Sequence, residues 1–142
     1  MAWGGFHWFP LRDSDKVITI TRRALCYLDE ENLIDATLTL LNVKGVGIAR
    51  ATKVLGLYDQ EKLCIYDSRV GKAIKKLTHN KDPIIKCPPG RSRPGDACSP
   101  TQWAKNYQKL TWTLEIIRDY LEEKGYPFRI ADIEMALFMM GK

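Results

Sequence analysis

The sequence predicts an all-α fold, because its apolar residues recur at helical spacing and no β-hairpin pattern is present. The clearest helix is expected from Thr101 to Lys124, ended by Gly125 and Pro127. Its apolar side chains recur at alternating steps of four and three residues: Trp103, Tyr107, Leu110, Leu114, Ile117 and Leu121. In a single domain, a seam of this kind is the side of a helix that faces the core, and less often the contact line of a coiled coil.

The first helix is expected to begin at Asp13 or Ser14, because either side chain can cap it, and to end near Leu28. Arg22 and Arg23 point away from its apolar face and are expected to be solvated. That apolar face consists of Val17, Ile20, Ala24 and Leu28.

Three further helices are predicted by composition and by their starting residues. Glu30 to Asn32 starts one that continues from Leu33 to Leu41 and is rich in Leu and Ile. A short basic helix is expected from Ser68 to Leu77. The last helix, from Arg129 to Met140, is nearly all apolar, so we expect it to be buried.

The 142 residues are expected to form one compact helical domain, residues 1–142, with its own hydrophobic core. No apolar run approaches the roughly 20 residues that span a bilayer. Met1 to Pro10 lacks the basic and long apolar regions of a signal peptide, so we expect a cytoplasmic protein with no membrane contact. The net charge of +5 is compatible with a polyanionic partner but does not establish one.

The four cysteines, Cys26, Cys64, Cys87 and Cys98, are scattered without a C-x-x-C pair. This spacing does not indicate a zinc or iron–sulfur site, and we expect neither metal nor cofactor. Cys87 and Cys98 bracket one loop and could meet, although thiols of cytosolic proteins are usually free. We expect all four cysteines to be structural.

Two segments are expected to lie outside the helices. Residues 1–12 form an aromatic arm, and residues 78–100 form a loop rich in Pro and Gly. Arg91 and Arg93 in the loop either meet a DNA backbone or are solvated, and His7 in the arm is expected to pack. The rings of the arm either pin it to the core or stack beside an extruded base: Trp3, Phe6, Trp8 and Phe9.

A glycine turn, Lys44-Gly45-Val46-Gly47, separates two predicted helices. Glycine permits the left-handed backbone angles of a sharp turn and lets another backbone approach closely. The second helix starts at once, so its free N–H groups and the positive end of its dipole form an anion site beside the turn. The simpler interpretation is an ordinary corner between two helices.

The sequence around this turn resembles a known family of DNA repair enzymes. LNVKGVGIARATKVL, residues 41–55, resembles the helix–hairpin–helix motif, which we place at residues 33–57. IYDSRVGKAI, residues 65–74, resembles the aspartate-bearing segment of the endonuclease III and 8-oxoguanine DNA glycosylase superfamily. The resemblance covers residues 33–77 well, and ADIEMALFMMGK at residues 131–142 only loosely.

The resemblance implies base-excision repair, in which the N-glycosidic bond of a damaged or modified base is hydrolysed. Asp67 occupies the place of the catalytic aspartate, whose carboxylate stabilises positive charge on the sugar. Asp67 is also well placed to cap the helix that begins at Ser68. Contacts with DNA are implied for the hairpin and nearby residues: Lys44, Gly45, Val46, Gly47, Ile48, Arg50, Lys53 and Arg69.

Two departures from the family pattern limit the implied chemistry. Ala49 stands where bifunctional members carry the lysine that forms a Schiff base, so the resemblance implies no efficient lyase activity. Lys53 lies one helical turn further on, where we expect a solvated lysine. Lys44 replaces the usual proline, which should loosen the turn only slightly.

The family places more residues before its hairpin than the roughly forty that precede Lys44 here. No residue of a base-recognition pocket can therefore be assigned from the resemblance. Two alternatives remain open beside the enzyme: a non-catalytic helix–hairpin–helix module that binds DNA, and a helical interaction protein. A second copy or another protein could supply the missing surface.

Overall fold

The computed structural model describes residues 14–78, 88 and 98–142. This part of the chain contains six α-helices and no strand, which confirms the all-α prediction for the described residues. The aromatic arm at residues 1–12 and most of the loop at residues 78–100 lie outside the described residues. The helices are α1 (Ser14–Asp29), α2 (Leu33–Leu41), α3 (Ile48–Tyr58), α4 (Ser68–Leu77), α5 (Pro100–Glu123) and α6 (Ile130–Met140).

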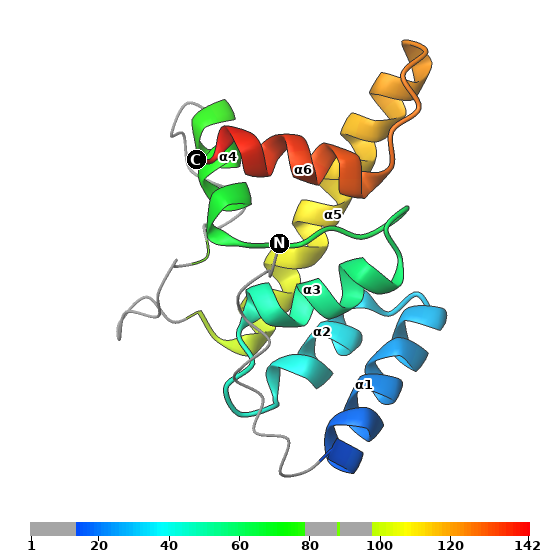
Figure 1. Cartoon of the computed structure of the whole chain (residues 1–142), viewed down its shortest axis with the longest axis vertical. Helices are drawn as coiled ribbons and strands as arrows, with labels where there is room; N and C mark the ends of the chain where they lie inside the picture. The colour runs from blue at the N-terminus through cyan, green and yellow to red at the C-terminus, as the bar shows by residue number, and fades with distance from the viewer. Residues whose placement is uncertain (1–13, 79–87, 89–97) are drawn as a thin grey trace.

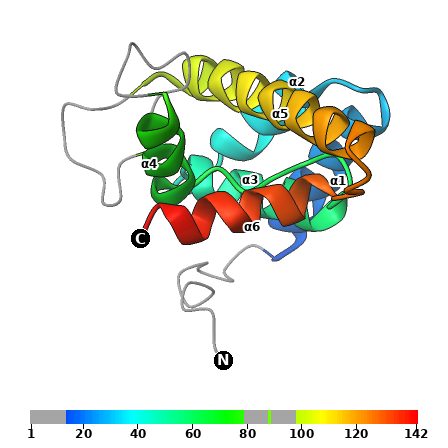
Figure 2. The ribbon, with the colours of Figure 1, turned by 90° about the horizontal axis from the view of Figure 1, so that it is seen from above.

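Helix α5 runs through the molecule and packs against α2, α3 and α6. Figure 1 shows α1, α2 and α3 at one end of the molecule and α4 and α6 at the other. Seen from above, α5 and α6 lie on opposite sides of the extended segment 59–67, which connects α3 to α4 (Figure 2). The residues of this segment therefore meet three helices at the centre of the molecule.

The helix boundaries follow from local capping groups. Asn32 Oδ1 accepts a hydrogen bond from the Asp35 N–H (3.1 Å), which fixes the start of α2. Ser99 Oγ does the same for the Gln102 N–H (3.2 Å), and Pro100 follows at the first helical position. Both caps satisfy N–H groups that have no partner within the helix. The predicted helices consequently agree with the structure to within one residue at these ends.

The apolar seam of α5 faces the core, as predicted. Tyr107, Leu110 and Leu114 are completely buried, and the remaining seam residues are partly buried against them. Tyr66 from the connecting segment packs edge-on against Trp103, with ring centroids 6.0 Å apart, and parallel to Tyr107. These aromatic contacts fix the connecting segment just before Asp67.

The expectation that α6 is buried holds for only one of its faces. Met135, Met139 and Met140 are each 47–54% exposed. Only one stripe of the helix packs against its neighbours, because α6 lies at the surface of the molecule on α4 and α5 (Figure 1). This buried stripe consists of Ile130, Ile133, Glu134 and Leu137, so it includes a carboxyl group that the sequence pattern did not single out.

The solvent-facing side of α5, opposite the buried seam, also carries large apolar side chains. Trp112, Ile116 and Tyr120 recur every fourth residue and are all exposed, Ile116 to 70%. Because these positions fall between those of the seam, they lie on the solvent side of the same helix. The sequence prediction accounted for one face of this helix and left the other unassigned.

Candidate active site

The turn between α2 and α3 is closed by two hydrogen bonds. The Val46 N–H donates to the Val43 carbonyl (3.0 Å), and Arg50 Nη1 donates to the Gly45 carbonyl (2.7 Å). Gly45 has φ +84°, in the left-handed region, whereas Gly47 caps α3 with φ −93° and ψ 174°. Only the first glycine therefore needs to be glycine for its backbone angles.

The start of α3 presents N–H groups without an acceptor. Among the described residues, the structure records no hydrogen bond from the N–H groups of Gly47, Ile48 and Ala49. Such groups, together with the helix dipole, attract an anion. The Ile48 side chain is 6% exposed and belongs to the core, so at this position only the backbone is available to a ligand.

The two glycines of the turn should respond differently to substitution. We expect Gly45→Ala to lower the free energy of unfolding by about 1–2 kcal/mol, because alanine is strained at positive φ. Gly47→Ala is the matched control, since its φ is ordinary and an added Cβ meets nothing within 4 Å. Urea denaturation of both variants measures the difference. An equal loss in the two would contradict the assigned backbone angles.

Buried hydrogen bonds fix the segment that leads to Asp67. Thr52 Oγ1, on α3, accepts from the Tyr66 N–H (2.9 Å) and donates to the Ile48 carbonyl (2.9 Å). The Tyr107 hydroxyl, on α5, donates to the Cys64 carbonyl (2.8 Å). Two helices thus hold the backbone on either side of Ile65. The sequence did not indicate a role for Thr52, and it placed Tyr107 in the apolar seam without predicting this hydrogen bond. The reason is that Tyr66 and Cys64, to which they bond, are distant in sequence.

Asp67 caps α4 and keeps part of its carboxylate available. Its Oδ1 accepts from the N–H groups of Arg69 and Val70, both at 2.9 Å. Because one oxygen accepts both bonds, capping does not occupy Oδ2. The side chain is partly exposed. The predicted capping role is confirmed, and the arrangement leaves an oxygen for a second contact.

A cavity of about 490 Å³ lies between α3, the connecting segment and α6, and we call it the α3–α6 cavity. Its walls include Leu57, Ile65 and Met135, and the Glu134 carboxyl group, which is only 6% exposed. Burial raises the pKa of Glu134 to about 7 from its ordinary value of 4.5. The negative charge of Asp67 adds to the rise in this pKa, and a hydrogen bond with the Ile65 backbone opposes it. Glu134 therefore connects the cavity with Asp67.

A larger cavity of about 660 Å³ lies between α1, α5 and the end of α3. Leu28, Tyr58 and Trp112 contribute to its walls. Neither Asp67 nor Glu134 lies in its walls. Size alone would favour this cavity, but the α3–α6 cavity is the one lined by Glu134, whose carboxyl group interacts with the charge of Asp67.

Lys53 does not occupy the solvated position expected from the sequence. It is partly buried and lies in the wall of the α3–α6 cavity. The reason is that this face of α3 forms the cavity wall together with the connecting segment and the start of α6, an arrangement that local periodicity does not reveal. Arg129 lies at the same cavity and is paired with Asp132 (2.8 Å).

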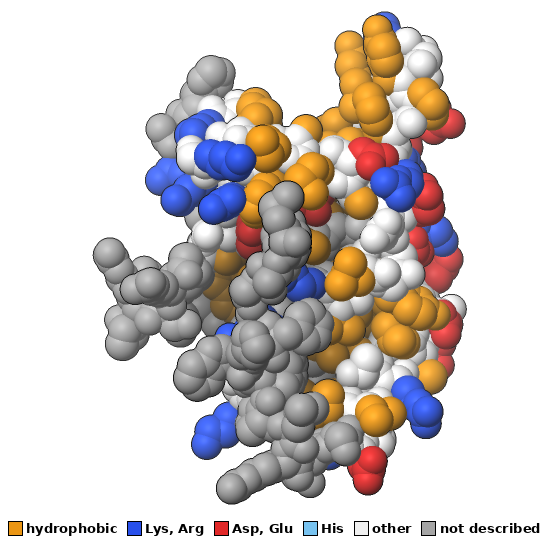
Figure 3. Space-filling view, in the orientation of Figure 1, with side chains coloured by type: hydrophobic (Ala, Val, Ile, Leu, Met, Phe, Trp, Pro, Cys, Tyr) orange, Lys and Arg blue, Asp and Glu red, His pale blue; other side chains and the backbone are white. Residues whose placement is uncertain are grey.

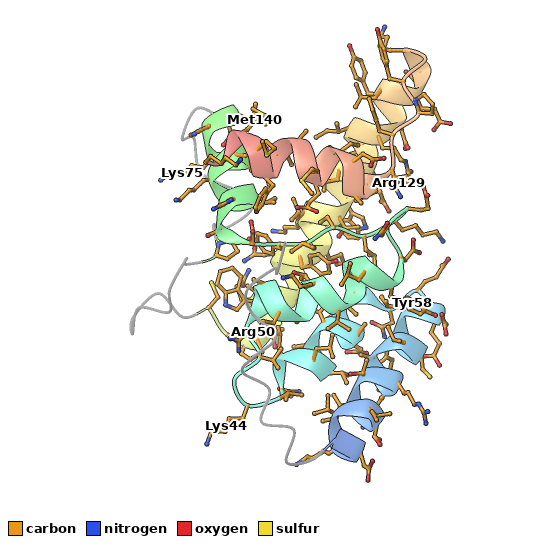
Figure 4. All side chains as sticks on the ribbon, viewed as in Figure 1. Lys44, Arg50, Tyr58, Lys75, Arg129 and Met140 are labelled. Atoms are coloured by element: carbon orange, nitrogen blue, oxygen red, sulfur yellow. The ribbon has the colours of Figure 1, made fainter. Side chains whose placement is uncertain are left out.

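Several cations from the hairpin and from α4 lie on one side of the molecule (Figure 4). Lys44 and Arg50, at the hairpin, and Lys75, on α4, project on the same side, with Arg129 and Tyr58 on the other (Figure 4). Figure 3 shows Lys and Arg side chains clustered over α4. These side chains are all exposed: Arg69, Lys72, Lys75 and Lys76.

Arg69 is held in place by α6. Its guanidinium carbon lies 4.6 Å from the centre of the Phe138 ring. Lys76 Nζ donates to the Met140 carbonyl (3.0 Å), so a second cation of α4 also contacts α6. The predicted DNA contacts differ in exposure: Val46 and Lys53 are partly buried, Ile48 is buried, and the others are exposed, namely Lys44, Gly45, Gly47, Arg50 and Arg69.

The described cysteines differ in environment. Cys64 is buried, and burial raises the pKa of its thiol well above the ordinary value of 9.0, so the reactive thiolate is disfavoured. Cys26 is exposed, which contradicts its expected structural role. Cys98 is partly exposed, whereas Cys87 lies outside the described residues. Within the described ranges, no three His, Cys, Asp or Glu side chains are grouped so as to hold a metal ion.

Comparison of the chain with protein-family models, with curated proteins and with solved structures gives no match. Among the helices of the described part, none has the length and apolar character needed to cross a membrane. The function must therefore be argued from the geometry of the residues themselves.

Proposed function

We propose that the protein is a DNA N-glycosylase without lyase activity, using a helix–hairpin–helix anchor and Asp67 as its essential carboxylate. The observation that carries this proposal is the position of Asp67. It follows a segment held by α3 and α5, it starts the basic helix α4, and Oδ2 is not used for capping. Glu134, which interacts with the charge of Asp67, lines the α3–α6 cavity.

Each part of this arrangement corresponds to one requirement of the reaction. The N–H groups at the start of α3, with Lys44 and the cations of α4, bind backbone phosphates. The target base leaves the stack and enters the α3–α6 cavity, whose volume is within the range of small-molecule sites. As the N-glycosidic bond breaks, Asp67 stabilises the positive charge that develops on the sugar, and water then adds to the anomeric carbon.

Release of bases from duplex DNA tests this proposal. Duplexes carry 8-oxoguanine, 7-methylguanine, hypoxanthine, uracil or mismatched adenine, and release is followed under single-turnover conditions. Asp67→Asn should slow release about 10²–10³-fold, because the amide cannot supply the carboxylate charge. No release from any duplex by the unmodified protein, or equal rates with Asp67→Asn, would overturn the proposal.

Asp59→Asn provides a matched control for this experiment. Asp59 also accepts backbone N–H groups through one oxygen, from Glu61 and Lys62, both at 3.1 Å. It lies in the wall of the larger cavity, away from the proposed site. The same chemical change should therefore leave base release within about twofold of the unmodified protein, as surface substitutions do.

A DNA-binding module without catalysis is the second candidate, favoured by the shared side of Lys44, Arg50 and Lys75 (Figure 4). It predicts sequence-independent binding that weakens steeply with salt, because phosphate contacts release counterions. Binding should then be equal in the unmodified protein and Asp67→Asn, with no base released by either. Fluorescence anisotropy at 50 and 200 mM salt, alongside the release assay, separates the two candidates.

A further inference from the structure

The solvent-facing side of α5 carries a row of apolar side chains, which we call the α5 outer stripe. It consists of Trp112, Ile116 and Tyr120, and each of them exposes more than half of its surface. At about 100° per residue, Trp112 and Tyr120 project about 40° to either side of Ile116, so the three side chains share one face. Figure 2 shows α5 along one edge of the molecule. A second helix therefore has access to this stripe from solvent.

Charged residues of opposite sign lie at the two ends of the stripe. The first part of α5, up to Leu114, contains two cations, Lys105 and Lys109, and no acid. Lys109 and Glu123 stand seven residues before and seven residues after Ile116, about 20° from its direction, and both are exposed. In the part of the chain that the structure describes, no ion pair is recorded for either side chain. The last part of α5 contains four acids and one arginine: Glu115, Arg118, Asp119, Glu122 and Glu123.

This distribution of charge opposes the preference of a single helix. The dipole of a helix favours acids in its first turn and cations in its last turn. In α5, the first turn contains no acid and the last turn contains no cation, whereas Glu122 and Glu123 lie at its C-terminal end. These charges therefore do not stabilise the isolated helix. An antiparallel neighbour would offset them, because it brings the positive end of its own dipole to this acidic end.

An antiparallel helix of the same sequence matches α5 in both charge and shape. About a twofold axis at Ile116, each residue lies opposite the residue that is equally far on the other side of Ile116. Lys109 of each copy then lies opposite Glu123 of the other copy, and this ion pair forms twice. Trp112 of each copy lies opposite Tyr120 of the other, and the two Ile116 side chains meet at the axis. A parallel pair would instead place Lys109 beside Lys109 and Glu123 beside Glu123.

We propose that the solvent-facing side of α5 is the interface of a homodimer, in which two α5 helices pack antiparallel about Ile116. The α5 outer stripe supplies the attraction, because its apolar surface is removed from water. The Lys109–Glu123 pairs set the direction of packing, since the parallel arrangement brings like charges together. No DNA or released base enters this inference, so it is independent of the proposed glycosylase function.

The length of α5 limits the strength of this dimer. The helix has 24 residues and is about 36 Å long, so two copies contact each other along a single strip. Interfaces that bury less than about 1,200 Å² are typical of weak association, and we expect a Kd of about 10–100 µM. The chain is then monomeric well below this concentration, and dimers form as the concentration rises.

Sedimentation equilibrium of the full chain, from about 5 to 500 µM, measures this Kd. Ile116→Asp places a charge at the axis in both copies, and we expect it to raise the Kd more than about tenfold. Ile18→Asp is the matched control, because Ile18 is 48% exposed and lies in the first half of α1. It should leave the Kd within about twofold of the unmodified protein. A chain that stays monomeric up to 500 µM, or a dimer unaffected by Ile116→Asp, would overturn the proposal.

Exchange of the charges at the two ends of the stripe tests the direction of packing. Lys109→Glu and Glu123→Lys each place like charges together at both pairs, so each should raise the Kd about tenfold. The chain that carries both substitutions regains opposite charges and should regain the original Kd. An equimolar mixture of the two single variants should also associate, because each Glu–Lys pair then forms between different chains.

Recovery in the double variant separates the interface from an effect on folding. Two substitutions that each damaged the fold would not restore association when combined, and circular dichroism checks the helix content of every variant. Equal Kd values in the unmodified protein, the two single variants and the double variant would show that α5 does not pack antiparallel on this face. That result would overturn the proposal.

Discussion

Raising the pH from 5 to 8 should lower the free energy of unfolding by about 2–3 kcal/mol, and Glu134→Gln should remove most of this loss. The pKa of Glu134 rises from 4.5 to about 7 on folding. The folded state therefore binds the Glu134 proton more tightly than the unfolded state does. The contribution of Glu134 to the free energy of unfolding is full below pH 4.5 and is lost as the pH rises through 7. About 1.4 kcal/mol per pKa unit gives an upper limit near 3.4 kcal/mol, and water entering the cavity reduces it.

Urea denaturation at pH 5, 6, 7 and 8 measures this effect. The comparison between the two proteins isolates Glu134, because every other titratable group is present in both. Asp132, whose pKa is lowered chiefly by its hydrogen bond with Arg129, contributes stability that is lost only in acid, below this window. Parallel pH profiles for the unmodified protein and Glu134→Gln would show that Glu134 is ionised in the folded state.

The parts of the fold that sequence predicted are those set by near neighbours. Helix α4 begins at Ser68 because Asp67 accepts the N–H groups of the next two residues, and this interaction needs no distant partner. The seam of α5 is set by the period of the helix, and a face so regular has to be buried. Both features were consequently predicted almost to the residue.

The features that sequence could not predict depend on packing between distant segments. Glu134 sits in an apolar run and gives no local signal, and α6 contacts α4, α5 and the connecting segment, which are all distant from it in sequence. Lys53 was expected to be solvated, because its local sequence does not reveal the cavity wall in which it lies. Thr52 bonds the Tyr66 N–H 14 residues away, and a threonine inside a helix does not indicate such a partner.

The sequence predicts where the glycine turn lies but not the backbone angles of its two glycines. Gly45-Val46-Gly47 predicts a tight corner between two helices, and the structure has one there. The sequence alone does not say which of the two glycines adopts positive φ. The backbone assigns this role to Gly45 and leaves Gly47 as an extended cap.

Leu114→Ala should lower the free energy of unfolding by about 2–5 kcal/mol, because it leaves a cavity in the centre of the core. Leu114 is completely buried on α5, the helix shared by both ends of the molecule (Figure 1). Ile116→Ala, two residues away and 70% exposed, is the matched control and should change stability by less than about 0.5 kcal/mol.

Urea denaturation followed by circular dichroism and by tryptophan fluorescence gives the measurement and checks for two-state behaviour. Because α5 contacts α2 and α3 as well as α6, the transitions from both probes should shift together in Leu114→Ala. A shift in one probe alone would mean that the end formed by α4 and α6 unfolds separately. The carboxyl groups of Asp67 and Glu134 would then depend on a weaker part of the fold than the hairpin, since α4 and α6 hold them together.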